Sequence, residues 1–217
     1  AQGFALIDLC QQWYDVVLMN PPFGEGSAQA KSYLGQAYPI SKNDVYAAFV
    51  ERWLGRLQPN GRLGAITSRT GFFLSSFRRW REEVLLAEAP PVVVADLGYG
   101  VLDAAMVETA AYVCSPILQN RTTPLLFLRL LEAEDKAAAC SAILRAILQN
   151  RTTGAFSVSA ESLRQVPGAP FAYWVSDQLR GLFQSLPPFA SEGRTAKQGL
   201  ATADDFRFDQ FHFHGCG

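Results

Sequence analysis

The residues with the clearest capacity for chemistry are Asn20-Pro21-Pro22-Phe23, which follow a short apolar run at residues 16–19. The run predicts a strand that is buried on both faces. The two prolines fix φ and remove two backbone donors, so the Asn20 side-chain oxygen and the Pro21 carbonyl are two acceptors close together. Phe23 adds a flat face for stacking. A strand that ends in this way suits a ligand site at the carboxyl edge of a parallel sheet.

Two interpretations of this tetrapeptide are open. Asn-Pro and Pro-Pro are common turn signals, so the stretch could be a proline turn with Phe23 in the core. Alternatively, Asn20-Pro21-Pro22-Phe23 resembles the catalytic motif of amino-group methyltransferases that use S-adenosylmethionine (SAM). Those enzymes methylate the exocyclic amine of adenine or cytosine, or a glutamine amide.

The chemistry of an amino group explains why these residue types are wanted. The lone pair of the adenine 6-amino group is delocalised into the ring, which makes the nitrogen a poor nucleophile. Acceptors on both amino hydrogens, Asn20 and the Pro21 carbonyl, favour a tetrahedral nitrogen and therefore the transition state. A base in a duplex must leave the stack to reach such a pocket.

Composition limits the class of protein. The 217 residues are 49% hydrophobic and carry a net charge of −1, which suits one globular domain or slightly more and does not suggest a strongly basic nucleic-acid-binding domain. No apolar span long enough for a membrane appears, so we expect a cytoplasmic protein with no membrane partner. The four cysteines lack metal-ligand or disulfide spacing, and neither they nor His212 and His214 predict a metal site.

The order of elements predicts a doubly wound α/β sheet. Residues 24–42 are predicted to be a mobile loop over the site or a plain surface loop, and Asn43 or Asp44 is predicted to cap the next helix. A second helix is expected at about 72–87, with its arginines on a solvated face. Predicted strands lie at 16–19, 63–67, 92–97, 107–114 and 125–131, and further helices at about 135–148 and 175–186. A seven-residue repeat, 117–123 and 147–153, has no physical explanation.

Four stretches together resemble a more specific family, the large adenine-specific DNA methyltransferases of phage-exclusion (BREX) systems and related fused restriction-modification enzymes. They cover most of residues 14–205. The stretches are Val17–Gly24; Lys42–Phe49 with Leu57–Leu63; Asp96–Gly98 with Val107–Ala110; and Pro167–Trp174 with Gln198–Thr202.

The resemblance implies a Rossmann-like SAM-dependent methyltransferase fold and roles for the matched residues. Asn20, Pro21 and Pro22 would hold the target amine, Phe23 would stack on a flipped adenine of DNA, and Asn20 would also lie close to the SAM methyl group. In the family, the SAM-binding half precedes the Asn-Pro-Pro-Phe strand. The chain is therefore expected to be the back half of such a domain.

The expected division is a catalytic half-domain at residues 1–148, followed at 149–217 by a connector toward a truncated target-recognition region. The predicted function is methyl transfer from SAM to the adenine N6 of DNA, in restriction-modification or phage defence, with defence-system proteins as possible partners and with the isolated chain inactive. Two alternatives are open: a catalytically silent interaction module with the same fold, and a methyltransferase that acts on a protein glutamine or on RNA.

Overall fold

The computed structural model describes residues 2–102, 107–116, 123–188 and 193, and the side chains from residue 7 onward. The chain divides into two compact units, residues 1–184 and 185–217. The repeat copy at 117–123, apart from Thr123, and the tail with His212, His214 and Cys216 lie outside the described residues. No helix of the described chain is long and apolar enough to cross a membrane.

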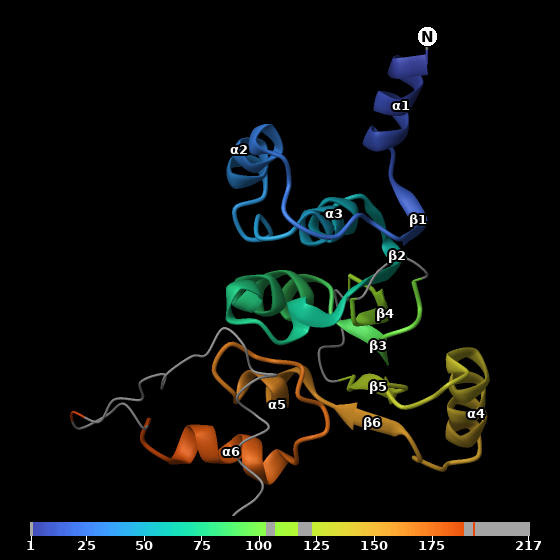
Figure 1. Ribbon diagram of the computed structural model, residues 1–217, viewed down its shortest axis with the longest axis vertical. Helices are drawn as coiled ribbons and strands as arrows, with labels where there is room; N and C mark the ends of the chain where they lie inside the picture. The colour runs from blue at the N-terminus through green and yellow to red at the C-terminus, as the bar shows by residue number, and fades with distance from the viewer. Residues whose placement is uncertain (1, 103–106, 117–122, 189–192, 194–217) are drawn as a thin grey trace, which may run out of the picture. The chain divides into compact units, whose positions relative to one another are not determined.

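A six-stranded mixed sheet organises the first unit, with the strand order β1-β2-β4-β3-β5-β6 (Figure 1). β1 is parallel to β2, and β3 is parallel to β5, while β4 runs antiparallel between β2 and β3. β6 is antiparallel to β5 at the far edge. The strands are β1 (Tyr14–Met19), β2 (Leu57–Ser68), β3 (Pro91–Gly98), β4 (Thr109–Cys114), β5 (Leu125–Arg129) and β6 (Ala155–Val158). Strands β1, β2, β3 and β5 thus end at the same edge.

Helices connect these strands. The helical elements are α1 (Gln2–Gln11), α2 (Ala28–Ala37), α3 (Val45–Leu54), the 3-10 turns η1 (Arg69–Phe72) and η2 (Ser75–Phe77), the π-helix η3 (Trp80–Glu88), α4 (Lys136–Leu148), α5 (Ala160–Arg164) and α6 (Asp177–Ser185). Sequence predicted helices at α3, α4 and α6 and one over about 72–87, but not α5 or the strand β6. Asp44 caps α3 as expected by accepting from the Tyr46 N–H at 3.2 Å. The predicted doubly wound α/β class is confirmed in a sheet of mixed direction.

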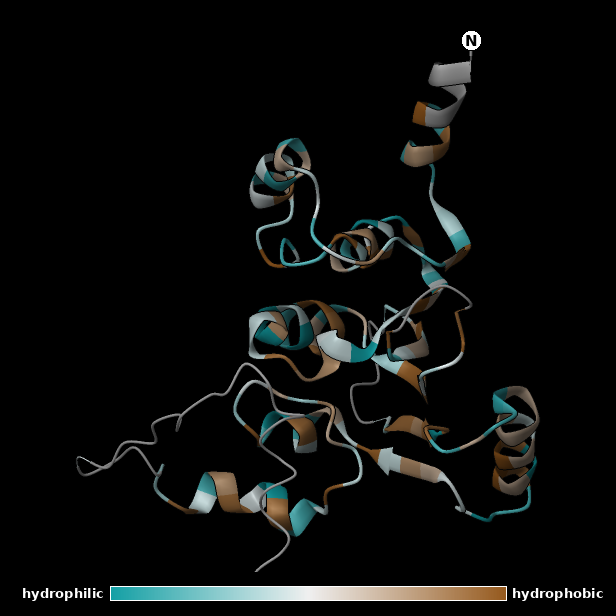
Figure 2. Ribbon diagram, in the orientation of Figure 1, coloured by the Kyte–Doolittle hydropathy of each residue, from teal (hydrophilic) through white to brown (hydrophobic). Residues whose placement is uncertain are grey.

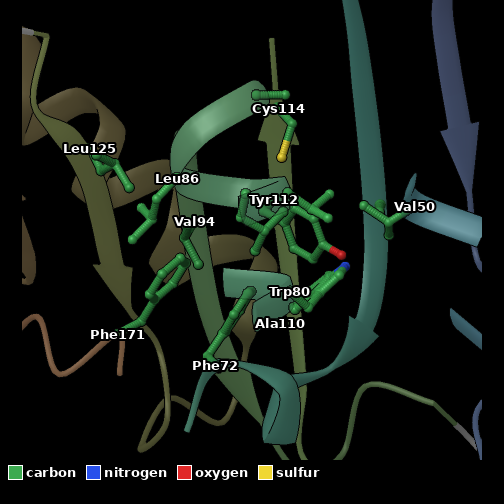
Figure 3. Close-up of a cluster of buried hydrophobic side chains, with 14 of the residues drawn as sticks. Val50, Phe72, Trp80, Leu86, Val94, Ala110, Tyr112, Cys114, Leu125 and Phe171 are labelled. Atoms are coloured by element: carbon green, nitrogen blue, oxygen red, sulfur yellow. The ribbon is translucent and has the colours of Figure 1, made fainter. Parts of the chain in front are cut away.

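The two faces of the sheet are covered unequally. On one face, residues from α3, η3 and α5 bury the larger core against the strands, and Figure 3 shows Val50, Phe72, Trp80 and Tyr112 in this cluster. On the other face, α4 packs against β3 and β5 through a smaller apolar cluster. Figure 2 shows the hydrophobic residues of α4 and the strands near it. The β1 end of this second face has no helix over it among the described residues.

Strand β1 is therefore not buried on both faces, as its apolar run had predicted. Val17 and Met19 pack against the larger core, but Val16 and Leu18 point to the other face and are 57% and 80% exposed. β1 is also an edge strand of the sheet and pairs only with β2 in the described chain. The apolar sequence of β1 predicts that both of its faces are buried, but one face is exposed in the first unit.

Two further elements differ from the sequence prediction. The segment 24–42 contains a helix, α2, whose N-cap is Ser27 and whose Leu34 is buried. In place of one regular helix at about 72–87 there are two 3-10 turns followed by the π-helix η3. Residues 58–61 lie within β2, where the register with β1 jumps between the Tyr14–Leu57 and Val16–Arg62 pairs.

Candidate functional site

The Asn-Pro-Pro-Phe segment begins where β1 ends, at the edge that also receives the ends of β2, β3 and β5. Asn20 is exposed, Pro21 is buried, and Phe23 is half-buried. The side-chain amide of Asn20 is therefore accessible to a ligand from the edge of the sheet. The structure thus places the four predicted residues at the carboxyl edge that their sequence had indicated.

Asp44 anchors the loop that follows Phe23. The Gly24 N–H donates to both carboxylate oxygens of Asp44, at 2.9 and 3.0 Å, and the Val45 N–H donates back to the Gly24 carbonyl at 3.0 Å. Gly24 has φ = +103°, which favours glycine. Burial raises the pKa of Asp44, although the backbone N–H groups of Tyr46, Gly24 and Val45 oppose this shift. Asp44 therefore caps α3 and fixes the loop at the same time.

Tyr46 packs directly against the Phe23 ring. The two rings meet edge to face with centroids 6.0 Å apart, and Tyr46 is itself stacked on Phe77 at 5.7 Å. The Tyr46 hydroxyl is buried, and burial raises its pKa. Phe23 thus packs against the larger core while part of its ring remains accessible. Packing in the core is therefore compatible with the predicted stacking on a ligand.

Asn20 also borders a first cleft of about 630 Å³, which lies over the uncovered end of the sheet. Its lining is otherwise almost wholly apolar and includes Leu18, Ile66 and Val113, with Cys140 and Leu144 from α4. No carboxylate is among the described residues that line it. Hydrogen-bonding partners for the ribose and amino-acid groups of SAM are therefore not supplied here beyond Asn20.

A second group of polar residues lies further along the same edge. The Arg69 guanidinium, just after β2, forms ion pairs of 2.8 Å with the buried Asp96 of β3 and with Glu108. The Tyr173 hydroxyl donates to Asp96 at 2.8 Å. Burial opposes the Arg69 cation, but the hydrogen bond to Glu108 and the charge of Asp96 outweigh it and raise the pKa of Arg69. This group holds three strand ends and the 167–174 segment together.

A second cleft of about 740 Å³ opens beside this group. Three aromatic rings and two arginines contribute to its wall, together with Thr70: Arg69, Thr70, Phe73, Arg129, Phe156 and Trp174. The Arg129 guanidinium lies over the Trp174 ring at 5.8 Å, and Arg69 lies over Phe73 at 4.8 Å. The edge of the sheet therefore carries a mixed polar and aromatic cleft in addition to the Asn20 segment.

Sequence reasoning missed most of this second cleft. It gave Arg69 and Thr70 no role in a site and named Asp96 only within the stretch Asp96–Gly98 of the family resemblance. A usable signal was present, because both polar residues fall at the ends of predicted strands, where parallel sheets bind ligands. Nothing in the sequence brings Trp174 to the same place, since that requires the fold.

The strand arrangement, with an Asn-Pro-Pro-Phe segment at the carboxyl edge, defines a methyltransferase fold of the class I SAM-dependent type. The type I restriction-modification methyltransferase subunit of Streptococcus thermophilus has a similar structure, with a TM-score of 0.56 and 17% identity. That match covers 74% of this chain and 37% of the other. The fold predicted from the sequence is thereby confirmed.

The comparison of sequences is more specific. Residues 2–96 match the family model of the Eco57I restriction-modification methylase. The chain is 26% identical over 203 residues to the adenine-specific methyltransferase PglX of Lacticaseibacillus casei (strain Zhang) and 28% identical over 197 residues to the adenine-specific methyltransferase BrxX of Escherichia coli O9:H4 (strain HS). These matches cover 90% and 88% of this chain. The chain is a relative of these methyltransferases, which confirms the resemblance predicted from its four stretches.

The chain is much shorter than the curated proteins it resembles. It spans 16% of the length of PglX and 15% of the length of BrxX.

Proposed function

We propose that this chain is part of an adenine-specific DNA methyltransferase, in which the complete protein transfers a methyl group from SAM to the N6 amino group of a flipped adenine. The observation that carries the proposal is the exposed Asn20, with Pro21, Pro22 and Phe23, at the carboxyl edge of a methyltransferase sheet. The relation to adenine-specific methyltransferases supports adenine as the acceptor.

The proposed roles follow from the atoms that the loop presents. The Asn20 side-chain oxygen and the Pro21 carbonyl accept from the two amino hydrogens and so favour the tetrahedral nitrogen of the transition state. Pro22 stiffens the loop, and the accessible part of Phe23 stacks on the adenine ring. Asp44 keeps this loop in place through its two contacts with the Gly24 N–H.

In this part of the chain, Asn20 is the residue that we propose to contact SAM. When bound, the cofactor supplies an electrophilic methyl group on a sulfonium. The apolar lining of the first cleft provides no carboxylate for its ribose, so we propose that other residues of the complete protein make most of the cofactor site. The proposed division of labour places the catalytic half-domain at 1–148 and a connector toward target recognition at 149–217.

The decisive experiment measures methyl transfer from labelled SAM to DNA by the complete protein and by its Asn20→Ala and Asn20→Asp variants. Removal of one transition-state hydrogen bond is expected to lower the rate on the order of 100-fold to 1,000-fold. Asn20→Asp keeps the shape and the acceptor oxygen but replaces the amide NH2 with a second, charged oxygen, which separates geometry from electrostatics. Equal labelling of DNA by the wild type and Asn20→Ala would refute the proposal.

The nature of the acceptor is tested on the same products. N6-methyladenine in digested DNA supports the proposal, whereas label in a protein glutamine or in RNA assigns the other acceptor. Absence of SAM binding and of label with every acceptor, by a folded complete protein, identifies a silent module. Any association with a nuclease or other defence proteins is a further part of the proposal and is tested by co-purification with the complete protein.

A further inference from the structure

The second cleft combines an exposed aromatic platform with a cation that lacks a carboxylate partner. Trp174 is 45% exposed although it contacts Phe73 and Tyr173, at centroid distances of 5.7 and 5.0 Å. Arg129 is exposed, and no carboxylate of the described residues pairs with it. Half-exposed tryptophan and arginine side chains of this kind are typical of surfaces that bind unpaired nucleotides.

The Trp174 platform is rigid. The Arg180 guanidinium is buried and donates to the carbonyls of Ala172 and Tyr173, at 3.1 and 3.2 Å. The Phe171 N–H donates to the Phe72 carbonyl at 2.9 Å, and the two rings stack at 4.8 Å. Because these contacts hold residues 171–173 and the Trp174 ring packs on Phe73 and Tyr173, little conformational entropy is lost when a ligand stacks on Trp174.

The charges in the cleft favour a base with one adjacent phosphate. Arg69 is paired with both Asp96 and Glu108, which engages the two carboxylates and leaves this group with one negative charge in excess. Arg129 remains as the cation available to a ligand. A neutral heteroaromatic ring suits the Trp174, Phe73 and Phe156 walls, and a single phosphate suits Arg129.

The cleft is also coupled to the Asn20 segment by direct packing. Phe23 contacts Tyr46, and a Cβ placed on Gly71 would lie 2.4 Å from the Tyr46 hydroxyl. Thr70, the residue before Gly71, lines the second cleft. One buried tyrosine therefore contacts Phe23 of the first site and lies beside Gly71, the neighbour of Thr70 in the second cleft.

We propose that the second cleft binds an unpaired nucleotide next to the target adenine, with its base stacked on Trp174 and its phosphate on Arg129. This inference rests on the proposed function. Removal of a base from a duplex disrupts stacking with its neighbours, and the cleft provides a replacement surface for one of them. The site is therefore expected to stabilise the flipped-out state and not to read the target adenine itself.

The test is fluorescence anisotropy of a labelled single-stranded oligonucleotide of mixed sequence with the full chain. Trp174→Ala is expected to raise the Kd about 5-fold to 100-fold, as loss of one base–aromatic stack does elsewhere, and Trp174→Phe is expected to retain most of the affinity. Arg129→Ala is expected to weaken binding. It should also reduce the slope of the logarithm of the binding constant against the logarithm of the salt concentration by about one, as expected for the loss of one phosphate contact. Arg79→Ala is the matched control, because Arg79 is exposed and pairs only with Glu83.

The outcomes separate this inference from the proposed function. Absence of binding by the unmodified chain, or an unchanged Kd for both Trp174→Ala and Arg129→Ala, overturns the inference. Circular dichroism confirms that each variant is folded, and the exposed Arg129 provides the second variant if Trp174→Ala is unstable. If Asn20→Ala abolishes DNA labelling in the complete protein while the cleft variants bind normally, only the cleft assignment fails. If the cleft variants lose binding but the label appears in glutamine, the proposed acceptor fails instead.

Discussion

At the scale of single residues, Asp44 links the candidate catalytic loop to the scaffold. One carboxylate accepts from the Gly24 N–H and also from the Tyr46 N–H at the start of α3. Substitution of Asp44 should therefore affect both the stability of the fold and the geometry of the Asn20 segment. The two effects can be separated by substitution, since an amide retains a capping oxygen and a methyl group does not.

Asp44→Ala is expected to lower the free energy of unfolding by about 1 kcal/mol, the usual cost of losing an N-cap. Asp44→Asn should cost less, because asparagine is a comparable cap. Chemical denaturation of the chain measures both. In the complete protein, Asp44→Ala should also reduce methyl transfer. Equal stability of the wild type and Asp44→Ala would show that the two backbone contacts contribute nothing.

Asp44 should also give the stability a specific pH dependence. Burial raises its pKa in the folded chain, so the folded state binds the proton more tightly than the unfolded state. The stabilisation associated with this proton is present below the ordinary value of about 4 and is lost as the pH rises through the folded value. The difference in unfolding free energy between Asp44→Asn and the wild type should therefore shift in favour of the variant between acidic and neutral pH. A difference that is constant with pH would contradict this.

At the scale of elements, Arg81 joins η3 to the segment that carries Trp174. Its guanidinium is buried and donates to the carbonyls of Gly71, Leu74, Gly168 and Ala169, at 2.7 to 3.1 Å. Burial among neutral groups lowers the pKa of Arg81 to about 10. The sequence prediction of a solvated arginine face is thus wrong for Arg81, although Arg78 and Arg79 are exposed and pair with Glu82 and Glu83.

Arg81→Met is expected to lower the free energy of unfolding by about 3 kcal/mol or more, because several buried carbonyls lose their donor. Arg79→Met, two residues away on the exposed surface, should leave the stability unchanged. Urea denaturation of both variants against the wild type gives the comparison. Similar midpoints for Arg81→Met and the wild type would contradict the contribution to stability that we assign to the Arg81 hydrogen bonds.

Five of the six strands and the α3 cap were predictable, because short apolar runs and an aspartate before a helix are local signals, whereas β6 was not predicted. The Asn20 segment was predictable for the same reason. Arg81 was not, since its partners at residues 168–169 are distant in sequence, and neither was the π-helix η3, in which Trp80 and Arg81 are both buried. The exposed face of β1 was mispredicted because an apolar run does not say what covers it.

At the scale of the whole molecule, the first unit leaves apolar surface uncovered. Leu18 and Val16 lie at the outer strand, beside the first cleft. An outer strand with an apolar face is a common site of self-association. The isolated chain should therefore associate at micromolar to millimolar concentration through this region.

The double variant Val16→Lys, Leu18→Lys is expected to remain monomeric at concentrations where the wild type associates. Charges on an outer strand oppose edge-to-edge pairing, and neither side chain is buried in the first unit. Leu148→Lys is the control, since Leu148 is 85% exposed at the end of α4. Sedimentation velocity measures the outcome. Association that persists in the double variant but disappears in Leu148→Lys would place the contact elsewhere.

The close approach of Gly71 to Tyr46 has a consequence for the evolution of the chain. Alanine at position 71 would place a methyl group 2.4 Å from the tyrosine hydroxyl and 3.0 Å from the Trp80 ring. Phenylalanine at position 46 removes the closer of these two contacts. Positions 46 and 71 should therefore vary together among homologues, with alanine tolerated only beside phenylalanine. The Phe23 ring would then keep its orientation through a pair of substitutions, neither of which touches the substrate.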